Sequence, residues 1–374
     1  MDNEWNNNEA QEAVSALQIK CPSCGGAMMY APKTRSLQCV YCGVTKPLSV
    51  KPVEIHENDY VQWARKSDEE KAKTAQEQSM TAQQVQCDQC GATVVMDSTK
   101  SSTKCPYCGT PLILERAQIK RFWQPDYLLP FAIDKKECNA LFTKWLNGKW
   151  FLPSKYKKGD VVGEKFYGVY YPYWTYDAHT QTSYEGERGT DRRVSVKDSN
   201  GKTSTKTVTD WKYVSGTVSR SFDDILVPAS KNLPANIIAE LKKWPLKSIV
   251  PYSPEFTAGF TTDVYTVDFT EGVVTAKKQM ESTIDEDIRK DIGGNHQRIS
   301  GKKVFYSDLM FKLVLLPLWI GIFKTENKSY QFIINGHSGE VHGDYPMDKL
   351  KIALVVLGCI LLLALLFFLV VTFG

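Results

Sequence analysis

The sequence has few histidines and lacks the common phosphate-binding and hydrolytic motifs. None of its five histidines stands in an H-E-x-x-H or other close metal-binding spacing. Gly201-Lys202-Thr203 resembles the end of a phosphate loop, but Val196 occupies the position of its first glycine. No G-x-S-x-G nucleophile elbow occurs. These absences argue against a P-loop ATPase or helicase and against an α/β-hydrolase, and we predict a protein that is not an enzyme.

A large net charge and a secretion signal are also missing. The chain of 374 residues has a net charge of +4, too small to indicate a nucleic-acid partner unless the basic residues are concentrated in one place. Residues 1–17 are polar and contain no basic stretch followed by an apolar run, so we expect no signal peptide. Eight of the ten cysteines form C-x-x-C pairs near one end, which favours metal binding in a reducing compartment over disulfides.

The paired cysteines form two matched sets of four, in residues 18–50 and 84–116. In each set, fourteen residues separate two C-x-x-C pairs, and a glycine follows the second cysteine of every pair. Four thiolates suit tetrahedral Zn²⁺, and they leave no position for water or substrate. We therefore predict two structural Zn²⁺ ions in two zinc ribbons, with rubredoxin-like iron as the alternative. The predicted ligands are Cys21, Cys24, Cys39, Cys42, Cys87, Cys90, Cys105 and Cys108.

The two sets indicate an internal duplication, since Tyr41 and Tyr107 also occupy equivalent positions. Counting the side chains and a bound Zn²⁺, the first module carries about +2 and the second about −1. Phosphate binding needs several basic contacts on one face, which the first module could barely supply. A protein-contact or purely structural role is therefore favoured over nucleic-acid binding for both modules.

Residues 51–83 and 125–346 differ in composition from the modules. The first stretch is rich in Gln, Lys, Glu and Ala and predicts a helical linker. The second predicts a mixed α+β domain, with helices over Lys135–Trp150, Ala235–Trp244 and Val273–Ile292. Cys138 falls in the first of these helices and is interpreted as a buried structural thiol.

Strand patterns fill the remainder of the central domain. Phe166–Asp177 is dense in aromatic residues, for which a sheet core is a more common explanation than base or sugar stacking. Arg193–Val227 alternates, and Asn200-Gly201 within it predicts a hairpin turn. Leu313–Phe323 is apolar but too short to span a membrane, so we predict a buried strand followed by a hairpin over 328–341.

The C-terminal residues 352–374 predict a transmembrane helix. They contain no charged residue, and 23 residues of helix span ~34 Å, close to the thickness of a hydrocarbon core. Lys349 and Lys351 precede this stretch, which predicts that the N-terminal bulk lies in the cytoplasm. We expect a single-pass, tail-anchored protein of the cytoplasmic membrane, and Gly358 and Cys359 would allow helix packing in an oligomer.

Several segments together resemble a bacterial family of membrane-anchored zinc-ribbon proteins that are often labelled primosomal protein N′ or PriA-like helicase. The resemblance rests on YYPYWTYD (170–177), GERG (186–189), FDDILVPAS (222–230), IGGNHQRIS (292–300), MFKLVLLPLW (310–319) and KSYQFIINGHSGEV (328–341). It implies N-terminal ribbons, a cytoplasmic domain and a C-terminal anchor. Relatives of this architecture tend to be associated with phage-shock-protein-A-like and flotillin-like (SPFH) membrane proteins.

These observations lead to two hypotheses from different classes. The favoured one is an adaptor or scaffold that presents two zinc ribbons to protein partners at the membrane, and the resemblance implies a role in envelope maintenance. The alternative is a nucleic-acid-binding accessory factor, related to the primosome or to transcription, that is tethered to the membrane. Salt-dependent DNA binding by the N-terminal modules would distinguish them.

Overall fold

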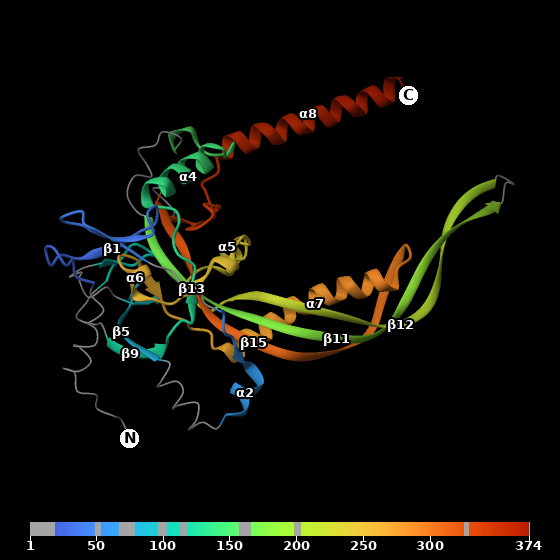
Figure 1. The fold of residues 1–374 in the computed structure, drawn as a ribbon. Helices are drawn as coiled ribbons and strands as arrows, with labels where there is room; N and C mark the ends of the chain where they lie inside the picture. The colour runs from blue at the N-terminus through green and yellow to red at the C-terminus, as the bar shows by residue number, and fades with distance from the viewer. Residues whose placement is uncertain are drawn as a thin grey trace.

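The computed structural model describes residues 19–48, 54–66, 79–95, 103–112, 118–156, 166–197, 203–324 and 329–373. These residues form a mixed α+β protein, as the sequence predicts. A body contains both cysteine modules, a long arm extends from it, and a C-terminal helix projects separately (Figure 1). The polar segment 1–17 and the predicted Asn200-Gly201 turn lie outside the described residues.

One 12-stranded sheet joins the body to the arm. At its centre β11 (Phe166–Lys197) and β15 (His296–Lys324) pair antiparallel, from Phe166 opposite Gly321 to Gly189 opposite His296. Both strands are far longer than an ordinary strand. The other strands of this sheet are β4 (Asn58–Asp59), β5 (Ser79–Gln86), β6 (Thr93–Val95), β9 (Gln118–Trp123), β10 (Tyr127–Leu128), β12 (Thr203–Pro228), β13 (Val250–Pro251), β14 (Thr261–Asp263), β16 (Ser329–Asn335) and β17 (Val341–Gly343).

The arm consists of β11, β12 and β15 with one helix on its face. β12 runs antiparallel to β11 from Pro228 opposite Tyr173 to Thr203 opposite Lys197, which confirms the predicted hairpin on both sides of its turn. The helix α7 (Phe269–Ile292) agrees with the predicted 273–292 helix and ends at Gly293, whose φ is 68°. Its buried side chains recur every three or four residues and pack on the sheet. They belong to Val273, Ala276, Met280, Ile284, Ile288 and Ile292.

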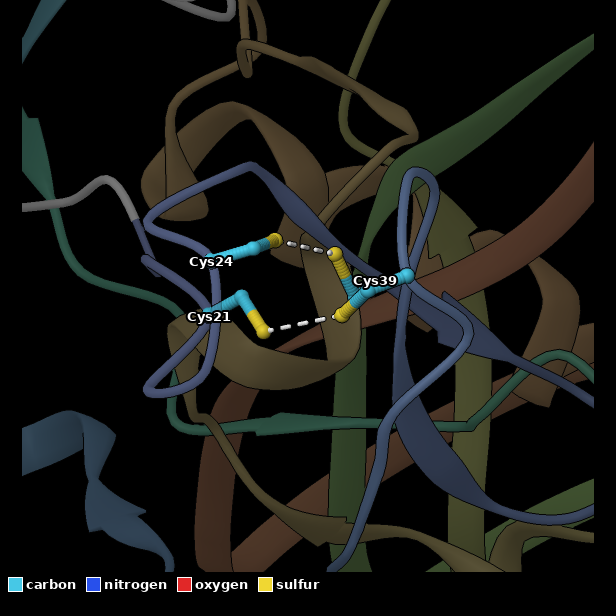
Figure 2. Close-up of side chains that lie close together, drawn as sticks. Cys21, Cys24 and Cys39 are labelled. Atoms are coloured by element: carbon cyan, nitrogen blue, oxygen red, sulfur yellow. Dashed lines mark hydrogen bonds between the residues drawn. The ribbon is translucent and has the colours of Figure 1, made fainter.

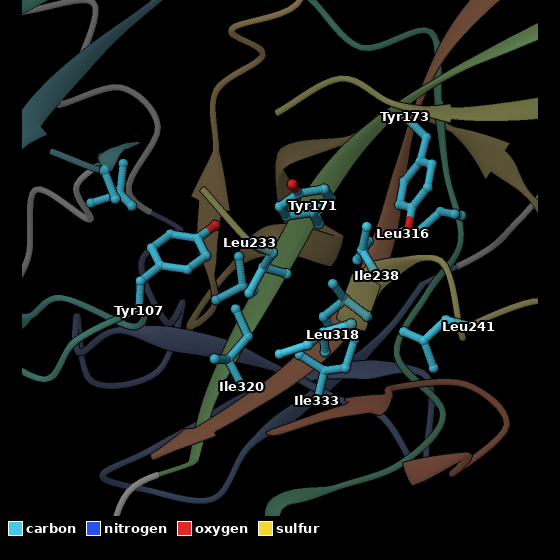
Figure 3. Packing of buried hydrophobic residues seen from close by; sticks show 14 of the residues in the cluster. Tyr107, Tyr171, Tyr173, Leu233, Ile238, Leu241, Leu316, Leu318, Ile320 and Ile333 are labelled. Atoms are coloured by element: carbon cyan, nitrogen blue, oxygen red, sulfur yellow. The ribbon is translucent and has the colours of Figure 1, made fainter. Parts of the chain in front are cut away.

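The aromatic run of β11 forms the core of the body, as predicted. Tyr171 and Tyr173 belong to the cluster in Figure 3, whereas Trp174 and Tyr176 face α7, because successive side chains point to opposite faces of a sheet. Three of these rings have backbone partners: Trp174 Nε1 donates to the Val267 carbonyl at 2.8 Å, the Tyr171 hydroxyl to the Ser230 carbonyl at 2.5 Å and the Tyr176 hydroxyl to the Phe269 carbonyl at 2.6 Å. The buried Tyr173 hydroxyl has no partner among the described residues. The run is therefore not available for stacking on a ligand.

Two helix predictions have different outcomes. The helix predicted over Lys135–Trp150 is present as α4 (Lys135–Asn147) and is capped by Asp134. It contains the fully buried Cys138, as expected. The predicted Ala235–Trp244 helix is wrong beyond its first turn, since α5 spans only Ala235–Ile238. Beyond α5 the Lys243 carbonyl accepts a hydrogen bond from Asn335 Nδ2 at 3.1 Å, and Pro245 disfavours a helical conformation at Trp244. Short helices also occur at α6 (Pro254–Thr257) and in two 3₁₀ turns, Ser154–Tyr156 and Leu246–Ser248.

The predicted helical linker over 51–83 is wrong for most of its described residues. Only α2 (Tyr60–Arg65) is helical, whereas β4 precedes it and β5 begins at Ser79. β5 pairs with β6 and β9, so strands from before residue 125 belong to the same sheet as the central domain. The sequence of β5 is polar and weakly patterned, and the neighbouring strands decide its structure.

The C-terminal helix α8 (Lys349–Phe373) projects from the body (Figure 1). Its apolar side chains are exposed. Over Lys349–Thr372 it is long and apolar enough to cross a membrane. Asp348 begins the helix by accepting hydrogen bonds from the Leu350 and Lys351 amides at 3.0 and 3.4 Å. The Lys351 ammonium donates to the Leu152 carbonyl at 2.6 Å and so connects the start of α8 to the body.

Candidate metal centres

The structure brings the eight predicted cysteines together in two groups of four. In each group all four Sγ atoms lie within 4.8 Å of one another. In the first module Cys21 Sγ lies 3.5 Å from Cys42 Sγ, and Cys24 Sγ lies 3.5 Å from Cys39 Sγ (Figure 2). The corresponding distances in the second module are 3.5 and 3.6 Å. A tetrahedral Zn²⁺ with Zn–S bonds of ~2.3 Å requires Sγ atoms ~3.8 Å apart, so both groups fit such an ion.

All four C-x-x-C pairs have the same turn. In each turn the amide of the following glycine donates to the carbonyl of the first cysteine, at 2.8 to 3.1 Å. These glycines, Gly25, Gly43, Gly91 and Gly109, have φ between 72° and 75°. Residues with a side chain rarely adopt this left-handed conformation, which explains why a glycine stands at each of these positions.

Backbone amides favour the thiolate form of two cysteines in the first module. Amides of Cys42 and Tyr41 donate to the Cys39 sulfur and lower its pKa to about 6. The Ser23 amide lowers the pKa of Cys21 in the same way. The thiolate is the form that binds a metal, so these amides favour coordination by Cys21 and Cys39, whereas neighbouring thiols raise the pKa of Cys24 and Cys42. Bound Zn²⁺ would hold the two pairs of each module together and would have a structural role, because all four positions belong to cysteines.

The first module has its own sheet and packs against the body. It contains β1 (Met28–Ala31), β2 (Ser36–Cys39) and β3 (Thr45–Pro47), paired in that order. The Tyr30 amide donates to the Ala258 carbonyl at 3.0 Å, and its ring lies 5.3 Å from that of Phe256, edge to face. Its cysteines Cys21 and Cys39 belong to the same buried cluster as Phe131 and Phe142 of the body.

The second module is part of the large sheet. Its first C-x-x-C turn connects β5 to β6, whereas β7 (Thr103–Lys104) and β8 (Pro111–Leu112) form a separate pair around the second turn. Tyr107 lies in the cluster that contains Tyr171 and Leu233 (Figure 3). Its hydroxyl donates to Asp263 Oδ2 at 2.7 Å. The duplicated sequence therefore gives the same metal-binding turns but different surroundings.

The equivalent tyrosines of the two modules differ most in exposure. Tyr107 is 7% exposed, whereas Tyr41 is 78% exposed. Val40, next to Tyr41, is also exposed. The second module thus uses its turn to attach to the body, and the corresponding turn of the first module presents apolar surface to solvent.

The basic residues of the first module are not all available to an anionic partner. Lys33 forms an ion pair with Glu137 of α4, and this leaves Lys20, Arg35 and Lys46. Three basic residues are few for nucleic-acid binding, which usually neutralises several phosphates. The packing of the module therefore weakens the nucleic-acid alternative further.

A cluster of acidic residues around Lys312 is not apparent from the sequence. Carboxylate oxygens of Glu57, Asp177 and Asp224 lie within 4.8 Å of one another. The Lys312 side chain is only 2% exposed and forms ion pairs with Glu57 and Asp224, the latter at 2.6 Å. Burial and the Glu57 carboxylate raise the pKa of Asp177 to about 7. These residues come from four separate parts of the chain, so no local pattern could predict the cluster.

Comparisons with known proteins identify a distant relative. The chain is 25% identical over 338 residues to the uncharacterized protein YdjG of Bacillus subtilis strain 168, covering 90% of this chain and 92% of that protein. No family model and no solved structure matches the chain.

Proposed function

We propose that the protein is a non-enzymatic, membrane-anchored adaptor whose two Cys₄ modules each contain a structural Zn²⁺. In this proposal α8 anchors the chain in the cytoplasmic membrane, and Lys349 and Lys351 keep the N-terminal bulk in the cytoplasm. The first module then binds a cytosolic or membrane-associated protein. Phage-shock-type or SPFH-type membrane proteins are the candidate partners that the sequence resemblance implies.

The observation that carries this proposal is the difference between Tyr41 and Tyr107. The second module shows how such a turn packs against a protein surface. Its tyrosine, Tyr107, lies in an apolar cluster, and the Tyr107 hydroxyl donates to the buried Asp263 carboxylate. The first module has the same turn with Tyr41 and Val40 exposed. Exposed aromatic and apolar residues on a rigid turn are typical of protein-binding sites.

Copurification with variants of Tyr41 tests the proposal. The full chain is purified from solubilised native membranes, and the proteins that accompany wild type and Tyr41→Ser are compared quantitatively. We expect one or more accompanying proteins to decrease at least tenfold with Tyr41→Ser, which removes a contact of about 1.4 kcal/mol or more. Each such protein must then bind the purified wild-type chain directly.

A matched control uses an exposed aromatic residue elsewhere. Phe305 is 66% exposed on β15, and Phe305→Ser should leave the accompanying proteins unchanged. Metal analysis of both variants should give two Zn²⁺ per chain, because neither residue is a ligand. Recovery of no partner, together with turnover of a substrate by the soluble part, would contradict the proposal.

A further inference from the structure

The far end of the arm is a two-stranded ribbon without a core. β15 begins at His296, which pairs with Gly189 of β11. Beyond this point only β11 and β12 pair, from Thr190 opposite Asp210 to Lys197 opposite Thr203. We call residues 190–197 and 203–210 the ribbon tip. Its side chains are exposed or half-exposed. A two-stranded ribbon gains little stability from burial, so the folding of the body does not explain this extension.

The ribbon tip carries a net positive charge. It contains four basic residues, Arg192, Arg193, Lys197 and Lys206, against two acidic residues, Asp191 and Asp210, a net charge of +2. Arg192 pairs with Asp210 at 2.5 Å, whereas Arg193, Lys197 and Lys206 form no ion pair with any other described residue.

Both faces of the ribbon tip contribute to this charge. Because side chains alternate along a strand, Arg193 and Lys197 point to one face and Lys206 to the other. Val194, Val196 and Val208 share the face of Lys206. One face therefore combines basic and threonine side chains, and the other combines basic and apolar side chains.

We propose that the ribbon tip binds the anionic headgroup surface of the membrane in which α8 is anchored. Clusters of basic residues close to a membrane anchor bind anionic lipids, and each basic residue near such a surface strengthens binding about fivefold. The anchor keeps the lipid surface at a high effective concentration, so a few such contacts suffice. The arm and α8 leave the body toward the same side of Figure 1.

The composition of the ribbon tip favours a lipid surface over duplex nucleic acid. Duplex binding depends on many phosphate contacts, and the described tip has three unpaired basic residues. The three valines match the boundary between headgroups and acyl chains, which takes up apolar side chains next to basic ones. This inference requires α8 to be inserted, but it does not depend on partner binding by the cysteine modules.

Hydrogen–deuterium exchange of the full chain in vesicles tests the proposal. The chain is inserted into vesicles of phosphatidylcholine alone or of phosphatidylcholine enriched in phosphatidylglycerol. We expect amides of the ribbon tip to exchange about tenfold more slowly in the anionic vesicles, and the difference to disappear at high salt. Insertion itself is measured separately, by flotation with the vesicles.

Charge-reversal variants show whether the basic residues are responsible. Arg193→Glu, Lys197→Glu and Lys206→Glu together should abolish the protection. The control reverses the same number of charges at the exposed Lys242, Lys243 and Lys278, away from the tip, and should retain it. Equal exchange of the wild-type tip in both kinds of vesicle would overturn the proposal. So would protection of the tip by duplex DNA without protection by anionic vesicles.

Discussion

Single residues of this protein have consequences well beyond their own position, and Asp263 is the clearest example. Its carboxylate is 2% exposed and accepts hydrogen bonds from the Tyr107 hydroxyl and, at 2.7 Å, from Asn232 Nδ2. Burial raises its pKa to about 7, although the three side-chain donors Tyr107, Ser230 and Asn232 lower it. The residue that attaches the second module to the body is thus also one that titrates near neutral pH.

Asp263→Asn should change how stability depends on pH. The folded protein keeps a proton on Asp263 up to about pH 7, whereas an unfolded aspartate releases it near pH 4. The folded state therefore binds the extra proton, and this residue makes stability fall as the pH rises through that window. The total effect is at most about 4 kcal/mol.

The measurement is the melting temperature of wild type and variant in detergent across that window. Wild type should lose stability relative to Asp263→Asn as the pH rises from about 4 to about 7. The exposed Asp344→Asn serves as the control and should shift the curve uniformly or not at all. If the difference in melting temperature between wild type and Asp263→Asn does not change with pH, burial does not shift the pKa of the Asp263 carboxyl group.

Replacing a turn glycine should weaken metal retention through the backbone alone. No atom lies within 4 Å of the position that a Cβ would occupy at Gly25 or Gly91, yet both residues have positive φ. Gly25→Ala or Gly91→Ala should therefore cost about 1–2 kcal/mol, from conformational strain and not from a clash. Faster release of Zn²⁺ to a coloured chelator would show this loss.

Gly301→Ala provides the matched control for this experiment. A Cβ at Gly301 also meets no atom within 4 Å, and its φ lies outside the left-handed region. Release of Zn²⁺ should be unchanged in this variant. Equal release rates in all three variants would contradict the argument.

At the scale of elements, the two modules should respond differently to loss of a ligand. Cys24→Ser leaves the first module with its own small sheet, which is separate from the large one. Cys90→Ser disturbs the turn between β5 and β6, and β6 pairs with β14 of the body. We expect faster amide exchange confined to residues 19–48 in the first variant and extending into β14 and β5 in the second.

One result of comparing Cys24→Ser with Cys90→Ser would contradict the expected difference between the modules. Metal analysis should give one Zn²⁺ per chain for both. If Cys90→Ser changes exchange only between residues 87 and 112, and not in β5 or β14, the second module is independent of the sheet despite its pairing. The same exchange data also report on Tyr107, which connects the module to the cluster of Tyr171.

Elements fixed by local chemistry are the ones that the sequence predicts well. The C-x-x-C-G turns, the Asp134-capped helix α4 and the helix α7 that ends at Gly293 depend on residues close in the chain. By contrast, β5 lies in a polar stretch that favours a helix by composition, and pairing with β9 outweighs that preference. α5 is also shorter than predicted, and the Lys243 carbonyl beyond it pairs with Asn335, which lies 92 positions away in the chain.

The arm shows the same limit on a larger scale. The alternation of Arg193–Val227 and the apolar run Leu313–Phe323 both predict strands, but neither predicts that β11 and β15 pair over more than 20 positions. Such pairing joins residues more than 100 positions apart, and only the folded structure shows it. The Lys312 cluster depends on this pairing too, because Asp177 lies on β11 and Lys312 lies on β15.

For the whole molecule, α8 should determine where the protein resides. A chain that ends at Asp348 lacks the apolar helix and should move from the membrane fraction to the soluble fraction in a simple fractionation. Its metal content should remain two per chain, since no predicted ligand is removed. A truncated chain that still sediments with membranes would show that another surface is sufficient for attachment.

Orientation can be measured on the same anchored chain. External protease on intact spheroplasts should leave the N-terminal bulk uncut, and lysis should expose it, if Lys349 and Lys351 face the cytoplasm. Cutting of the modules in intact spheroplasts would place them on the outer side of the membrane. This result would contradict the proposed cytosolic partners as well.

The length of β11 also has a mechanical consequence. One continuous strand runs from the tip to the place where the three large buried clusters meet, with Tyr170, Tyr171 and Trp174 each in a different one. A load applied to the tip is therefore transmitted along a single backbone to the centre of the body. Pulling from the tip should first unzip the exposed ribbon one residue pair at a time, at low force. The unfolding force should rise sharply once strand separation reaches the stretch of β11 that α7 covers.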